Sequence, residues 1–147
     1  MNHKTWSMKQ GAIEISGKVI HGEEYGRILG FPTANLDRRS YSRRNMNIRL
    51  GVWAGSAVVQ ATGLPNKAGQ WPALQKPRPA AIVIGPIDKN GLPKIEAHLL
   101  NFKGNLYGKK LIISLNKFIR PFKKFKNETE LKKQIKKDII EIKKYGN

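Results

Sequence analysis

Gly30-Phe31-Pro32-Thr33-Ala34-Asn35-Leu36 follows a glycine-rich run and places a hydroxyl and a carboxamide two residues apart. On an extended strand, this spacing puts the side chains of Thr33 and Asn35 on the same face. Their neutral oxygen atoms are hard donors, which suit Mg²⁺ carrying phosphates better than zinc. The preceding glycines let the backbone approach an anion closely and point amide groups at it. This segment therefore predicts a corner that binds phosphate and magnesium.

Outward from this corner, alternating and short apolar runs predict five or six strands. The expected strands are residues 12–20, 51–62, 80–85, 94–102 and 109–119, and residues 21–36 are expected to be glycine-rich and turn-like, ending in the Pro-Thr-Ala-Asn-Leu segment. Residues 88–91 (Asp-Lys-Asn-Gly) are typical of a hairpin turn, whereas the basic segment 37–50 and the proline-rich segment 63–79 are expected to be loops. Because no helices alternate with the strands, we expect antiparallel pairing.

The tail changes from a strand-like to a helical period, and a helix is expected over residues 127–145. Its apolar residues recur on one stripe: Leu131, Ile135, Ile139 and Ile142. Asn127, followed three residues later by Glu130, is typical of a helix N-terminus. The sequence thus predicts a mainly β, small antiparallel barrel closed by a C-terminal helix, an arrangement that removes exposed strand edges.

The composition sets the broad class of protein. A chain of 147 residues without an internal repeat is expected to form a single domain over residues 1–147, with residues 1–10 flexible. There is no cysteine, no apolar run long enough to span a membrane and no signal-peptide pattern at the start. We therefore expect a cytoplasmic protein without membrane contact, and we expect it to be a monomer.

The net charge of +18 attracts polyanions, among them nucleotides and nucleic acid, although lysines also commonly coat a solvated surface. The charge gathers in an arginine cluster within residues 38–49 and in the tail from Lys117 onward. Aromatic residues interleave with cations over residues 118–125, a pattern that suits stacking on bases, stacking on a small flat ligand, or simple core packing. Neither a Walker motif nor a protein-kinase signature is present.

Glu96 is a candidate general base, because it is a carboxylate inside an otherwise apolar strand of a chain that is poor in acids. Beside a magnesium nucleotide, such a carboxylate can orient and deprotonate an attacking hydroxyl. The alternative is a solvent-facing residue, or a partner for one of the many cations. A strand period of two places Glu96 and His98 on the same face. His98 alone is more typical of a structural histidine than of a catalyst.

The chain resembles the riboflavin kinase (flavokinase) domain of bacterial FAD synthetases, a domain that also exists as a stand-alone enzyme. The resemblance covers nearly the whole chain and runs in the family's order. Its most specific motifs are the Pro-Thr-Ala-Asn segment at 32–35 and Glu-Ala-His-Leu-Leu at 96–100. The other matching segments are residues 17–22, 26–31, 51–55, 106–108, 118–121, Phe125, Leu131 and 134–135.

The resemblance implies a six-stranded antiparallel Greek-key barrel with a C-terminal α-helix. It implies transfer of the γ-phosphoryl group of ATP to the ribityl 5′-hydroxyl of riboflavin, with Mg²⁺ as cofactor and FMN as product. By analogy Glu96 would be the general base, and Thr33 and Asn35 would bind the metal. The implied nucleotide-binding residues are Gly22, Arg27, Thr33, Asn35, Leu99, Asn101 and Tyr107. Arg120 and Phe125 would contact the flavin.

The chain departs from the family pattern at several positions. Asn101 and Asn105 stand where the family usually has acidic residues, and the segment 64–79 is unusually rich in proline. We expect no adenylyltransferase module of the kind that bacterial enzymes usually carry upstream, so the reaction is expected to stop at FMN unless a separate protein makes FAD. The alternative to the kinase is a non-catalytic basic β-barrel that binds nucleic acid or flavin; nucleic acid is the less favoured partner.

Overall fold

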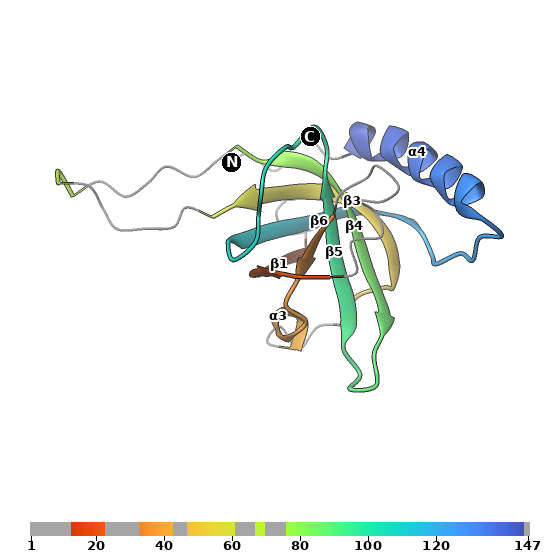
Figure 1. Ribbon diagram of the computed structural model, residues 1–147, viewed down its shortest axis with the longest axis horizontal. Coiled ribbons are helices and arrows are strands. Elements are labelled where there is room, and N and C mark those ends of the chain that lie inside the picture. Colours follow the sequence, from red (N-terminus) through yellow and green to blue (C-terminus); the bar gives the residue numbers. More distant parts are fainter. Residues whose placement is uncertain (1–12, 23–32, 43–46, 61–66, 70–75, 146–147) are drawn as a thin grey trace, which may run out of the picture.

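The structure, a computed structural model, describes residues 13–22, 33–42, 47–60, 67–69 and 76–145. Its strands close into an antiparallel barrel in the order β1-β2-β5-β4-β3-β6, with one long helix outside (Figure 1). The strands are β1 (Ile13–Ile20), β2 (Ala34–Leu36), β3 (Gly51–Val59), β4 (Arg78–Ile87), β5 (Pro93–Leu99) and β6 (Lys110–Arg120). The helices are α3 (Arg39–Ser42) and α4 (Glu128–Tyr145). The predicted six-stranded barrel with a C-terminal helix is confirmed.

The barrel interior is filled by the inward-facing residues of each strand. In β5 the buried side chains alternate with partly exposed ones, so that Ile95 and Ala97 are fully buried while Glu96 between them faces outward. Ile15, Ile82 and Ile113 from other strands are also fully buried. Alternation of this kind buries one face of each strand, and the burial of branched apolar side chains there supplies the main driving force for closing the barrel.

Gly55 marks an irregularity in the pairing of β3 with β6. The register shifts twice, between Val52 and Trp53 and between Ala54 and Gly55. A Cβ added at Gly55 would lie 1.8 Å from the carbonyl oxygen of Ser114, so the close approach of the two strands requires glycine here. The predicted bend or bulge at the glycines of this strand is therefore confirmed.

Helix α4 covers the outer surface of β3 and β4 (Figure 1). Ile142 packs with Ala54 and Leu100 in a small cluster outside the barrel core, and all three are buried. The helix begins as predicted, because the backbone amide of Glu130 donates to Oδ1 of Asn127 at 2.9 Å. The predicted apolar stripe is only partly buried, however, and Asp138 lies buried within the same face at 5% exposure.

Three segment predictions need correction. The basic segment 37–50 is not only a surface loop: it contains α3, and Ser40 and Ile48 are buried. The end of the proline-rich segment belongs to a strand, because Arg78 and Pro79 pair in β4. The strand expected over residues 94–102 ends at Leu99, since Asn101 adopts a left-handed φ of 58° that turns the chain. The expected flexibility of residues 1–10 lies outside the described residues.

Candidate active site

A cavity of about 560 Å³ opens where β1, β2 and β5 meet the segment that follows β5. Its walls include several residues singled out from the sequence: Thr33, Asn35, Leu99, Asn105 and Tyr107. Residues separated by up to 74 positions in the chain thus converge because β2 lies between β1 and β5 in the barrel. A concave site of this size, walled by apolar groups with a few polar ones, is typical of small-molecule binding.

Asn35 is the most informative wall residue. The residue is only 7% exposed, and among the described residues its Oδ1 is the buried side-chain oxygen that has no hydrogen-bond partner. An unpaired buried oxygen costs free energy, so a native fold normally gives such an atom a partner. Thr33, immediately before β2, lines the same cavity. These two neutral oxygen donors fit a hard cation such as Mg²⁺.

The described residues include no group of three or more His, Cys, Asp or Glu side chains that could hold a metal ion. A cation at Thr33 and Asn35 would therefore take its remaining ligands from phosphate oxygens and water, which is the usual way that Mg²⁺ binds with a nucleotide.

Gly22 closes one side of Asn35. A Cβ added at Gly22 would lie 2.1 Å from Nδ2 and 2.6 Å from Oδ1 of Asn35. Any larger residue at position 22 would clash with the Asn35 carboxamide in its present position. The residues that follow β1 therefore pack directly against the candidate metal ligand. Arg27, which the resemblance also assigns to the nucleotide, lies outside the described residues.

Glu96 stands directly across from Asn35 in the antiparallel register of β2 and β5. Both side chains point away from the barrel interior, because their sequence neighbours Ala34 and Ala97 fill it. Glu96 is not itself in the cavity wall. Its Oε1 lies 2.6 Å from Nζ of Lys94, and the two side chains are 20% and 22% exposed. The arrangement brings a carboxylate next to a candidate metal site.

The far wall of the cavity is built by the segment after β5. The Tyr107 ring packs against the ring of His21 with centroids 3.6 Å apart and planes tilted by 33°, and Oδ1 of Asn105 accepts a hydrogen bond from the Tyr107 amide at 2.9 Å. Asn105 therefore shapes this turn without an acidic group. Asn101 lies outside the cavity wall; its carbonyl accepts a hydrogen bond from Nη1 of Arg78 at 3.2 Å.

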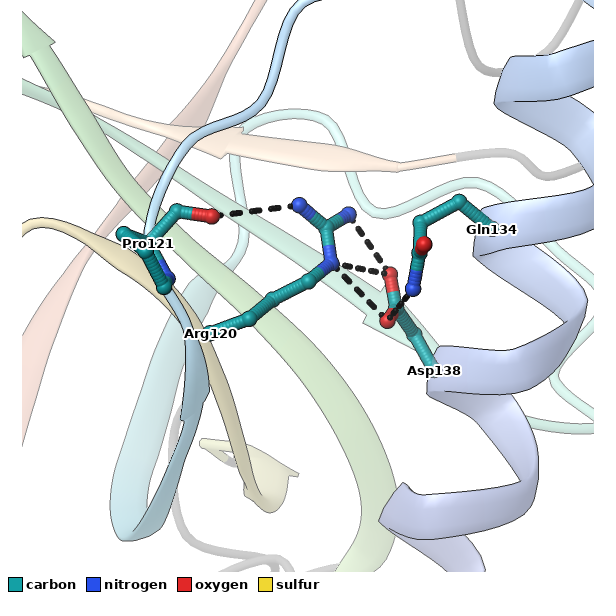
Figure 2. A network of polar contacts seen from close by, with 4 residues as sticks. All are labelled: Arg120, Pro121, Gln134 and Asp138. Atoms are coloured by element: carbon teal, nitrogen blue, oxygen red, sulfur yellow. Dashed lines mark hydrogen bonds and ion pairs between the residues drawn. The ribbon is translucent and has the colours of Figure 1, made fainter.

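Arg120 and Phe125 are not brought to this cavity. Arg120 binds the carboxylate of Asp138 through Nε at 3.0 Å and Nη2 at 2.7 Å, and Gln134 donates to the same carboxylate (Figure 2). The guanidinium carbon lies 5.9 Å from the centroid of the half-buried Phe125 ring. This network joins the end of β6 to α4, with 18% and 7% exposure of the Arg120 and Asp138 side chains.

Sequence reasoning missed Lys94 and Asp138 as partners of site residues. The pairing of Lys94 with Glu96 could have been predicted, because a strand period of two places both residues on the same face. Asp138 interrupts an apolar helical stripe, a position where an acid needs a partner, but the sequence does not say which cation supplies it.

Comparisons with known proteins show which family and which folds this chain is similar to. The family model for flavokinase, described as riboflavin kinase, matches residues 10–146. The bifunctional riboflavin kinase/FMN adenylyltransferase of Escherichia coli strain K12 is 35% identical over 133 residues, which are 89% of this chain and 37% of that protein. The chain thus spans little more than a third of that relative.

Two solved structures share the fold. A protein of Streptococcus pneumoniae described as a macrolide-efflux protein superposes with a TM-score of 0.69 at 22% identity, covering 92% of this chain and 40% of that one. The riboflavin kinase of Trypanosoma brucei superposes with a TM-score of 0.63 at 24% identity, covering 90% of this chain and 78% of that one. The match of the family model across nearly all of the sequence shows that this chain belongs to the flavokinase (riboflavin kinase) family.

Proposed function

We propose that this chain is a riboflavin kinase that transfers the γ-phosphoryl group of ATP to the ribityl 5′-hydroxyl of riboflavin, giving FMN and ADP. Family membership supports the reaction, and one structural observation supports its location: the unpaired, buried Oδ1 of Asn35 lies in a cavity wall opposite Glu96. A non-catalytic barrel that binds nucleic acid or flavin is not favoured, because it has no need for this pairing.

Thr33 and Asn35 would hold Mg²⁺ together with the phosphates of the nucleotide. When bound, the ion would neutralise charge on the transferring phosphoryl group. Leu99 and Tyr107 supply apolar and aromatic wall for the nucleotide, and Gly22 keeps Asn35 in position. Arg27 and Asn101 stay in the proposal as nucleotide-binding residues on the strength of the resemblance alone.

Glu96 is proposed to orient the attacking hydroxyl and accept its proton. Phosphoryl transfer depends mainly on in-line positioning and on neutralising the phosphate charge, so a base on the strand next to the metal ligands is well placed. Arg120 and Phe125 are proposed to border the flavin, where the Phe125 ring offers a face for stacking. The Asp138 carboxylate holds the guanidinium of Arg120 in one orientation.

The test is incubation of the purified protein with riboflavin, ATP and Mg²⁺, followed by chromatography for FMN. We expect FMN to accumulate with one ADP per FMN, and we expect chelation of the divalent ion to stop the reaction. Absence of FMN from a folded preparation that binds riboflavin would contradict the kinase and favour a binding protein. Replacement of Mg²⁺ by Mn²⁺ or Zn²⁺ in the same assay tests the choice of metal.

No described helix has the length and apolar character needed to cross a membrane. We propose that residues 1–147 act as one domain, since the barrel core and the α4 cluster adjoin along β3 and β4.

A further inference from the structure

Lys94 lies on the outer face of β5, two residues before Glu96. Its neighbours Pro93 and Ile95 are buried on the inner face, which fixes Lys94 and Glu96 on the same side of the strand. The Nζ atom of Lys94 is 2.6 Å from Oε1 of Glu96. Among the described residues, Lys94 is the ion-pair partner of this carboxylate.

This ion pair is shorter and less exposed than the surface pair on α4. The side chains of Lys94 and Glu96 are 22% and 20% exposed, whereas those of Lys144 and Glu141 on α4 are 60% and 44% exposed with a longer separation of 3.2 Å. Partly buried pairs are screened less by salt, and partial burial leaves both side chains less space to leave the pair. The Lys94 ammonium therefore restrains the Glu96 carboxylate.

We propose that Lys94 is a positioning residue for phosphoryl transfer, acting through Glu96. Its ammonium holds Oε1 and leaves Oε2 to receive the substrate hydroxyl. This inference rests on the proposed function, in which Glu96 is the base. In the step that it serves, the hydroxyl O–H bond breaks and its proton passes to Oε2. The hydroxyl oxygen bonds to the γ-phosphorus, and the bond from that phosphorus to the β–γ bridging oxygen breaks to release ADP.

The cross-strand position of Asn35 explains why orientation of Glu96 is important. The carboxylate lies opposite a candidate metal ligand, so its free oxygen has to point toward the hydroxyl rather than toward the bound cation. Small displacements of a reacting group cost large factors in rate, of order 10²-fold for about 1 Å. A lysine that fixes one carboxylate oxygen removes this freedom.

The experiment compares Lys94→Met, Lys94→Arg and the control Lys110→Met, each in the wild-type and Glu96→Gln backgrounds. Lys110 is also a strand lysine, and its side chain is exposed. Methionine keeps the length of the side chain without charge, and arginine keeps a cation. Thermal unfolding of every variant checks that the fold is retained.

We expect Lys94→Met to lower kcat about 10-fold while the KM values for riboflavin and MgATP stay within about 2-fold of wild type. Lys94→Arg should recover most of kcat, and Lys110→Met should match wild type. In the Glu96→Gln background, Lys94→Met should cause no further loss, because two residues that act through one group are not additive.

Three outcomes would overturn the inference: full kcat in Lys94→Met, a higher KM with unchanged kcat, or an equal loss from Lys94→Met in both backgrounds. A higher KM with unchanged kcat would mean that Lys94 contacts a substrate, and an equal loss in both backgrounds would mean that it contributes to turnover independently of Glu96. Both outcomes would leave the riboflavin kinase activity of the protein intact. Turnover at the wild-type rate in Glu96→Gln would instead show that Glu96 is not the base. Absence of FMN in assays of the wild-type protein would contradict the proposed function.

Discussion

Asn35 and Glu96 face each other across the antiparallel pair formed by β2 and β5. Side chains at such directly opposed positions have Cβ atoms about 5 Å apart, close enough for one substrate to contact both. The register of β2 with β5 therefore sets a neutral oxygen donor and a carboxylate beside each other.

Glu96→Gln is expected to lower turnover by about 10²–10⁴-fold, the usual contribution of a general base. Glutamine keeps the size of the side chain but cannot accept the proton. Riboflavin affinity, measured by flavin fluorescence, should stay close to wild type. Turnover at the wild-type rate would show that Glu96 is not the base.

Thr33→Ala and Asn35→Ala are each expected to weaken MgATP binding by at least about 10-fold, because each removes an oxygen donor of the proposed metal site. Riboflavin binding should change much less. Isothermal titration with MgATP and, separately, with riboflavin distinguishes the two effects. Unchanged MgATP affinity in both variants would exclude these residues as ligands.

Gly22→Ala tests the packing of Gly22 against Asn35. The added methyl group would lie 2.1 Å from Nδ2, so the carboxamide has to leave its position. We expect MgATP affinity to fall by about 10-fold or more, as when a supporting group of a metal site is lost. In the Asn35→Ala background the same change should have little effect; an equal loss in both backgrounds would mean that Gly22 acts elsewhere.

Asp138→Asn is expected to lower the free energy of unfolding by about 3 kcal/mol, because it leaves the poorly exposed Arg120 guanidinium without its carboxylate. Urea unfolding measures the change. The matched control is Glu141→Gln, which removes the exposed pair with Lys144 and should cost less than about 1 kcal/mol. Equal losses in the two variants would show that burial does not strengthen the Arg120–Asp138 pair.

Asp88 makes the stability of the fold depend on pH. The Leu92 amide donates to its carboxylate, Asn90 and Arg38 add further contacts, and the pKa of Asp88 lies below its usual value. A lowered folded-state pKa stabilises the fold above the unfolded-state pKa, near about 4, and this stabilisation is lost as the pH falls through the folded-state pKa. Asp88→Asn should therefore melt below wild type at neutral pH. Thermal melts should show the gap closing below about pH 4, and a gap independent of pH would contradict this role.

The features that could be predicted from the sequence are those set by local pattern. Alternation predicted the strand at residues 12–20, the spacing of Asn127 and Glu130 predicted the start of α4, and a two-residue spacing grouped Thr33 with Asn35, which both line the cavity. Each depends on residues that are neighbours along the chain, so local geometry is sufficient.

Relations between distant segments could not be predicted in this way. The register that sets Asn35 against Glu96 depends on how the barrel closes, and the pairing of Arg120 with Asp138 depends on where α4 docks. The helix within the basic segment at 39–42 was also missed, because its few residues carry no apolar period and its burial depends on contact with β1.

The three-residue strand β2 is the shortest strand of the barrel and pairs with its neighbours at few positions. Two Cα pairs join it to β1 and two join it to β5, whereas β3 and β6 are matched at eight positions. Separation of β2 from β5 would move Asn35 away from Glu96. Local opening of the barrel at β2 and loss of the site would therefore occur together. A bound nucleotide with its cation, in contact with β2 and β5 together, would stabilise the closed form of the barrel.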